Sequence, residues 1–77
     1  MFLHSNVALQ KGVSLDVIRV LERSGFLFVS QRGSHRKYRK GSVTLVVPFH
    51  NDDMRPGTLH HIIQQSGLTI EEFIQLL

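Results

Sequence analysis

Residues 26–47 read FLFVSQRGSHRKYRKGSVTLVV, and this stretch is the strongest indication of the architecture. Aromatic and β-branched residues dominate both ends of this stretch, and Gly33 and Gly41 interrupt it twice. Runs of this kind separated by short glycine-containing turns predict strands joined as an antiparallel meander. We expect strands over 26–31, 34–40 and 43–47, with Pro48 closing the third.

A helix is predicted before this stretch. Ser14 is a suitable N-cap, the helix runs to about Ser24, and Gly25 supplies the stop. Within it Val17, Ile18 and Leu21 form one apolar stripe. The helix is therefore amphipathic and should cover one face of the sheet.

Two more helices are predicted after the strands. Pro56 suits the first turn of one helix, which Gly67 ends, and its apolar stripe is Leu59, Ile62 and Ile63. Thr69 and Glu72 then have the spacing of a capping box. The last helix has apolar residues at i, i+3, i+4 and i+7, which are Ile70, Phe73, Ile74 and Leu77. The order α-β-β-β-α-α predicts an α+β fold in which a three-stranded antiparallel sheet carries helices on one face.

Length and composition indicate one small domain. The chain has 77 residues, 42% of them hydrophobic, and no cysteine, so neither a disulfide nor a thiolate metal site supports the fold. No run approaches the roughly 20 apolar residues that cross a bilayer. Residues 1–12 lack a signal-peptide pattern and are predicted to be a flexible leader to a domain at 13–77. We expect no membrane contact and a cytoplasmic location.

Positive charge is concentrated between residues 32 and 40. The net charge is +3, and five of the nine Lys and Arg residues are Arg32, Arg36, Lys37, Arg39 and Lys40. Such clustering favours a nucleic-acid partner over a uniformly solvated surface. The alternative is an edge strand kept soluble by its charges, and a salt titration of binding would separate the two.

One histidine lies inside this cationic segment. Strand alternation places His35, Lys37 and Arg39 on one face and Arg36 and Tyr38 on the other, with Tyr38 pointing inward. An imidazole is the side chain best suited to proton transfer near neutral pH. His35 is therefore a candidate catalytic residue, and a plain surface histidine is the alternative.

The other histidines and the phenylalanines carry simpler interpretations. His50, with Asp52 and Asp53 close by, is interpreted as part of a turn rather than a metal site. His60 and His61 are adjacent on a helix, diverge by about 100°, and should face solvent. Four phenylalanines are predicted to lie in the core rather than to stack on bases; they are Phe26, Phe28, Phe49 and Phe73.

From residue 13 to residue 77 the chain resembles the HicA-type mRNA interferase toxins. The resemblance rests on four motifs in the order and spacing of that family: VIRVLERSGF, QRGSHRKYRK, VTLVVPFH and RPGTLHHIIQQSGLTIEEF. It implies a fold like that of double-stranded RNA-binding domains. It also implies an enzyme that cleaves messenger RNA without a metal or other cofactor, and a HicB-like antitoxin as the protein partner.

The resemblance also assigns residues. His35 matches the essential histidine, Gly33 and Ser34 match the active-site turn, and residues 56–59 match the start of the following helix. The segment before Gly12 has no counterpart, and Leu15 stands where relatives often have a small residue.

Attack by a ribose 2′-hydroxyl on phosphorus needs a base, an acid and positive charge. His35 could serve as base or acid, and Tyr38, His50 or a water could supply the second proton-transfer group. Two other functions stay open: a non-catalytic RNA-binding module, and an inactive relative kept as a partner for a regulator.

Overall fold

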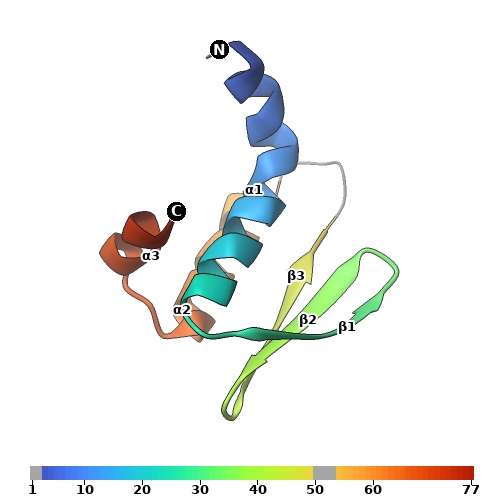
Figure 1. Cartoon of the computed structure of the whole chain (residues 1–77), viewed down its shortest axis with the longest axis vertical. Helices are drawn as coiled ribbons and strands as arrows, with labels where there is room; N and C mark the ends of the chain where they lie inside the picture. Colours follow the sequence, from blue (N-terminus) through green and yellow to red (C-terminus); the bar gives the residue numbers. More distant parts are fainter. Residues whose placement is uncertain (1–2, 50–53) are drawn as a thin grey trace.

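The computed structural model describes the backbone of residues 3–49 and 54–77 and the side chains of residues 13–49 and 54–77. Three helices and three strands follow one another in the predicted order α-β-β-β-α-α (Figure 1). Their bounds are α1 Leu3–Arg23, β1 Leu27–Arg32, β2 His35–Lys40, β3 Val43–Pro48, α2 Pro56–Ser66 and α3 Ile70–Leu76. Each predicted strand is confirmed to within one residue at either end.

The sheet is an antiparallel meander in the order β1-β2-β3, with β2 in the centre. Both hairpins turn over two residues, since Arg32 pairs with His35 and Lys40 with Val43. The helices lie together on one side of this sheet, as Figure 1 shows. The predicted α+β architecture is confirmed.

The core lies between the sheet and the helices. Tyr38, Leu45 and Val47 point inward from β2 and β3, and each is at most 1% exposed. They pack against buried residues of the helices and against Phe26, which follows α1. The helical residues are Val17, Ile18, Val20, Leu21, Ile62 and Phe73. The inward direction of Tyr38, predicted from alternation, is confirmed. Because the core occupies only one face of the sheet, the other face is left to solvent.

Helix α1 begins earlier than predicted. It starts at Leu3, so Ser14 lies inside the helix and is not its N-cap. The Ser14 side chain is instead 4% exposed, and its Oγ donates a 2.8 Å hydrogen bond to the Pro48 carbonyl at the end of β3. The helix extends into residues 1–12, whose flexibility remains a prediction.

The ends of the helices follow the predicted chemistry. At the end of α1 Gly25 adopts φ +108°, its N–H donates to Glu22, and the Phe26 N–H donates to Leu21, which is the Schellman arrangement. Gly67 ends α2 with φ +81°. Thr69 and Glu72 form both hydrogen bonds of the capping box at the start of α3. These three stop and start signals are confirmed.

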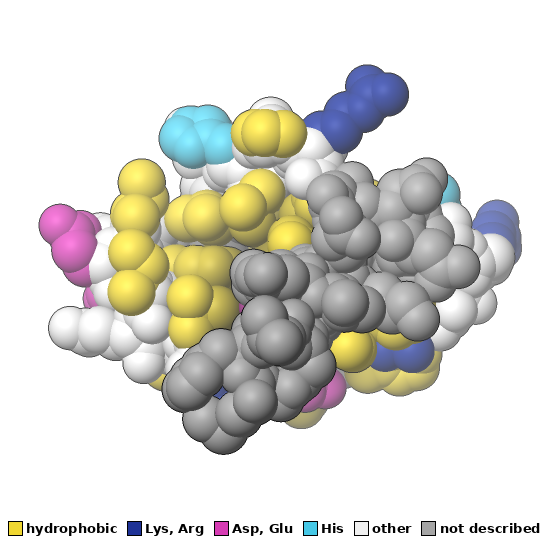
Figure 2. Space-filling model, turned by 90° about the horizontal axis from the view of Figure 1, so that it is seen from above, with side chains coloured by type: hydrophobic (Ala, Val, Ile, Leu, Met, Phe, Trp, Pro, Cys, Tyr) yellow, Lys and Arg dark blue, Asp and Glu magenta, His cyan; other side chains and the backbone are white. Residues whose placement is uncertain are grey.

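The predicted apolar stripe of α3 is wrong in part. Phe73 is buried and Leu76 packs against the core, but Ile70, Ile74 and Leu77 are each more than half exposed. Apolar side chains accordingly gather at the side of the molecule where α3 lies (Figure 2). In a helix of only two turns, one large side chain that packs into the core determines which face of the helix is buried. In α3 that side chain is Phe73.

Phe28 is also misassigned, because it is 53% exposed. It pairs with Tyr38 on the inner face and touches that ring edge-on, with centroids 5.8 Å apart, but it lies on an edge strand that no helix covers. Phe26 and Phe73 are buried as predicted, and Phe49 packs against the core from its rim.

Across the described residues, no helix combines the length and the hydropathy that a membrane span requires.

Candidate functional site

The face of the sheet turned away from the helices carries an ordered set of side chains. On the central strand His35, Lys37 and Arg39 follow one another at every second residue, and all three are exposed. Pairing extends each position across the sheet: His35 lies between Arg32 and Pro48, Lys37 between Ser30 and Val46, and Arg39 between Leu27 and Thr44. The first two of these cross-strand rows surround a depression.

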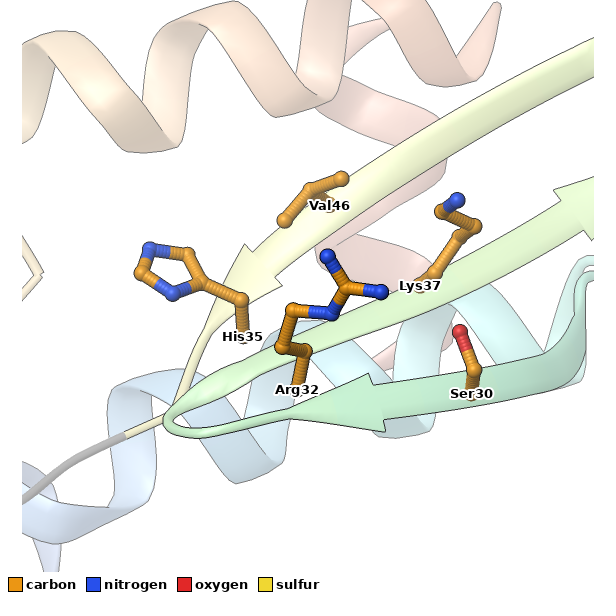
Figure 3. A pocket seen from close by; sticks show the side chains of 5 residues that line it. All are labelled: Ser30, Arg32, His35, Lys37 and Val46. Atoms are coloured by element: carbon orange, nitrogen blue, oxygen red, sulfur yellow. The ribbon is translucent and has the colours of Figure 1, made fainter.

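This depression has a volume of 260 Å³ and is lined by Ser30, Arg32, His35, Lys37 and Val46. Figure 3 shows the five side chains rising from the same side of the sheet, with the guanidinium of Arg32 between the imidazole and the ammonium of Lys37. The cations of Arg32 and Lys37 therefore share this depression with an accessible imidazole. A phosphate placed beside His35 would lie next to the guanidinium of Arg32.

A tight turn holds His35 at the start of β2. Gly33 has φ +58°, and glycine with positive φ at the first of the two turn positions is typical of a type II′ hairpin turn. The carbonyl of Ser34 accepts a hydrogen bond from the backbone N–H of Phe49, which continues the β2–β3 ladder beyond His35. The backbone of His35 is thus fixed on one side by the turn and on the other by the neighbouring strand.

A β-bulge at Val29 sets the direction of the β1 side chains. The register shifts between Phe28 and Ser30, so Phe28 points inward while Ser30 and Arg32 point outward with His35. Strict alternation from Phe28 would have turned Ser30 and Arg32 toward the helices. The bulge thus brings Arg32 and Ser30 to the depression, in keeping with the frequent occurrence of bulges beside functional sites.

The five cations of the central segment divide between the two faces. Arg32, Lys37 and Arg39 share the outer face with His35, whereas Arg36 and Lys40 lie on the other face. The guanidinium of Arg36 stacks 4.0 Å from the ring centroid of Phe49, and its Nε donates to Gln31. The guanidinium of Arg36 is therefore engaged in contacts within the protein.

Lys40 also has an intramolecular partner. Its Nζ donates a 2.6 Å hydrogen bond to the Ser24 carbonyl at the end of α1 and lies 5.9 Å from the Phe26 ring centroid. A cation at the C-terminus of a helix complements the negative end of the helix dipole. Of the cations predicted to bind RNA, only Arg32, Lys37 and Arg39 therefore lie on the same face of the sheet as His35.

Ser30 and Val46 are the two lining residues that sequence reasoning did not single out. The direction of Val46 follows from alternation with buried Leu45 and Val47, so that signal was available. The direction of Ser30 depends on the bulge at Val29, which no glycine or proline marks. Sequence alone could not have assigned Ser30 to this face.

The remaining histidines lie elsewhere. His60 and His61 are both exposed on α2, as predicted, and neither lines the depression. His50, Asp52 and Asp53 lie outside the described residues. Tyr38 is 1% exposed and points to the helices, so its hydroxyl is on the wrong side of the sheet to assist His35.

Comparison with known proteins supports the family resemblance. A comparison with individually curated proteins finds no match. The family model described as the HicA toxin of bacterial toxin–antitoxin systems matches residues 15–68, which include the end of α1, the whole sheet and α2. Since this match covers most of the chain, the protein belongs to the HicA toxin family of bacterial toxin–antitoxin systems.

Proposed function

We propose that this toxin is an endoribonuclease that cleaves messenger RNA, with His35 as its catalytic acid or base. The observation that carries the proposal is the position of His35 in an accessible depression that Arg32 and Lys37 also line. A phosphodiester is the common biological group that combines a negative charge with a bond whose cleavage requires proton transfer. Membership of a toxin family supplies the biological reason for such an activity.

The reaction requires two proton transfers and charge stabilisation. The ribose 2′-oxygen forms a bond to phosphorus and loses its proton to a base. The bond from phosphorus to the 5′-oxygen then breaks, and that oxygen receives a proton from an acid. The products are a 2′,3′-cyclic phosphate and a free 5′-hydroxyl. His35 performs one transfer, and water, which reaches the open depression, or His50 performs the other.

Arg32, whose guanidinium lies between the imidazole of His35 and the ammonium of Lys37, stabilises the negative charge that grows on the phosphorane oxygens. Arginine suits this role because its planar guanidinium offers donors in a fork that matches two phosphate oxygens. Charge stabilisation comes from this side chain, so the proposed mechanism needs no metal ion. Cleavage in the presence of EDTA at the same rate as without it is the expected result.

The central test compares His35→Ala with His61→Ala on a fluorescent single-stranded RNA. We expect His35→Ala to lower the cleavage rate by about 10²-fold or more and to keep most of the RNA affinity, because general acid–base catalysis contributes that much. His61 is an exposed histidine outside the depression, so His61→Ala should cleave normally.

Equal cleavage by wild type and His35→Ala would refute the catalytic role. RNA binding by the wild type without any cleavage would instead favour a non-catalytic RNA-binding module.

The partner that we propose is a HicB-like antitoxin whose acidic groups cover the His35 depression. The outer face of the sheet is cationic, and complementary charge speeds association and selects the partner. If the open reading frame beside the toxin encodes such an antitoxin, its product should inhibit cleavage, and Arg32→Ala with Lys37→Ala should weaken the complex. Undiminished binding to the double variant would place the antitoxin on another surface.

A further inference from the structure

We propose that a single strand of RNA runs lengthwise along β2, with Lys37 and Arg39 holding the two phosphates that follow the one at His35. The inference rests on the proposed function, since it takes His35 to mark the phosphate that is cut. It extends the site from one depression to a path that crosses the sheet face, and it adds Arg39, which does not line the depression.

The spacing of the three side chains supports this path. Positions two residues apart on a strand are about 6.7 Å apart and point to the same face. His35, Lys37 and Arg39 therefore form a straight column of three side chains separated by two such steps. That step is comparable with the distance between neighbouring phosphates in an extended nucleic-acid strand, so each side chain can serve one phosphate.

Among the residues that the structure describes, none beside the column would repel a polyanion. Its lateral neighbours on the outer face are neutral or cationic: Arg32 and Pro48 beside His35, Ser30 and Val46 beside Lys37, and Leu27 and Thr44 beside Arg39. From residue 23 to residue 51 the sequence contains no aspartate or glutamate. The described carboxylates all lie on the helices, as Asp16 and Glu22 do on α1 and Glu71 and Glu72 on α3.

Arg39 remains able to bind a phosphate. Its Nε donates a 3.0 Å hydrogen bond to the carbonyl of Gly41, which fixes the direction of the side chain. This bond uses one of the five donors of the guanidinium and leaves the others free for an anion. Arg36 and Lys40, in contrast, contact Phe49 and Ser24 on the opposite face.

The path recognises the sugar–phosphate backbone and not the bases. Single-strand binders that read bases expose aromatic rings on the sheet. Apart from His35, every residue named on this outer face is aliphatic, polar or cationic, and the ring of Tyr38 on β2 points to the core. We therefore infer weak dependence of affinity on base identity.

The test is a length series. Uridine oligonucleotides of two to eight nucleotides, with every 2′-hydroxyl methylated, cannot be cleaved by 2′-oxygen attack and serve as binding probes. A dinucleotide has a single phosphate, a trinucleotide two and a tetranucleotide three. Lys37→Ala should therefore begin to lose affinity at three nucleotides, and Arg39→Ala only at four.

The salt dependence gives a second measure. Each phosphate contact to a single strand contributes about 0.7 to the slope of log affinity against log salt concentration. Arg39→Ala should lower that slope by about 0.7 for the octanucleotide and leave it unchanged for the dinucleotide.

Arg36→Ala is the matched control, because it removes the same charge from the opposite face of the same strand. Its effect on affinity should be small and independent of length. Arg36 packs on Phe49, so thermal unfolding must show that the variant is folded. If it is not, Arg55→Ala, at the start of α2 and exposed, provides the control for net charge.

The outcomes are distinct. If wild type binds none of the oligonucleotides, the proposed action on RNA fails and the path fails with it. If wild type binds them, two results would refute the path along β2 while the site at His35 stands. In the first, Arg39→Ala loses as much affinity for the dinucleotide as for the octanucleotide. In the second, Arg39→Ala loses no more affinity for the octanucleotide than Arg36→Ala does. An order in which Lys37 acts at shorter length than Arg39 supports the path.

Discussion

Lys37 and Lys40 show how two equal charges on one strand take different roles. Lys37 lines the His35 depression on the outer face, whereas Lys40 reaches the end of α1 and donates to the Ser24 carbonyl. The physical difference is the partner of each ammonium group: solvent for Lys37, and a carbonyl at the C-terminal end of α1 for Lys40.

We predict that Lys40→Ala affects the stability of the fold and Lys37→Ala affects RNA binding. Lys40→Ala should lower the free energy of unfolding by about 0.5–1 kcal/mol, because an exposed cation at a helix C-terminus contributes that much, and should hardly change RNA affinity. Lys37→Ala should weaken RNA binding at unchanged stability. Urea unfolding and RNA titration of both variants check this, and a loss of RNA affinity in Lys40→Ala equal to that in Lys37→Ala would contradict it.

At the residue scale, sequence predicts which face a side chain occupies but not what it touches there. Alternation alone placed His35 outward and Tyr38 inward. The partner of Lys40 is 16 residues away in sequence and on another element, and the ring under Arg36 belongs to Phe49 beyond the third strand. Such contacts depend on the packing of α1 and the return of β3, which no local pattern encodes.

At the scale of elements, the two hairpin turns form a natural matched pair. Both have glycine followed by serine, and Gly33 and Gly41 have nearly the same φ, +58° and +59°. A methyl group added at either glycine would meet no atom within 4 Å, so substitution strains only the backbone. One turn carries His35, and the other lies at the far end of β2.

We predict that Gly33→Ala and Gly41→Ala lower stability equally but differ in activity. A non-glycine residue in the left-handed region costs about 1–2 kcal/mol in each case. Only Gly33→Ala should also slow RNA cleavage, by about tenfold or more, because displacement of the turn moves His35 relative to the phosphate. Thermal unfolding and cleavage assays on both variants decide the matter, and equal cleavage rates would show that the Gly33 turn does not position the catalytic group.

Element prediction succeeds where local chemistry determines a boundary and fails where tertiary contacts do. Gly25, Gly67 and the Thr69–Glu72 capping box are local signals, and each acts where expected. The direction of α3 is decided by the single anchor Phe73, so three of the four predicted stripe residues face solvent. The bulge at Val29 has no local signal, which is why Ser30 was missed.

In the whole molecule, the helical layer and the sheet have different roles. The helices bury one side of the sheet and carry the described carboxylates, and this arrangement leaves the other side exposed and cationic. Pro48 is the partner of His35 on β3 and the last residue of that strand. The position of this strand end relative to the helices therefore needs a contact of its own. A partly buried hydrogen bond from α1 provides this contact: Ser14 Oγ donates to the Pro48 carbonyl.

Ser14→Ala should therefore weaken the connection between the layers. Loss of the donor leaves the Pro48 carbonyl without that partner, at a cost of about 1–3 kcal/mol in the free energy of unfolding. Ser24→Ala is the matched control, since the Ser24 hydroxyl bonds only to Leu21, whose carbonyl also accepts from the Ser24 and Phe26 backbone N–H groups. That carbonyl stays satisfied, so Ser24→Ala should cost at most about 0.5 kcal/mol. Urea unfolding of the two variants measures the difference, and hydrogen exchange should show faster opening at the Phe49 N–H in Ser14→Ala alone. If both variants unfolded at the same urea concentration, the Ser14 bond would contribute nothing beyond an ordinary helix-end contact, and the position of β3 beside His35 would have to depend on the apolar core alone.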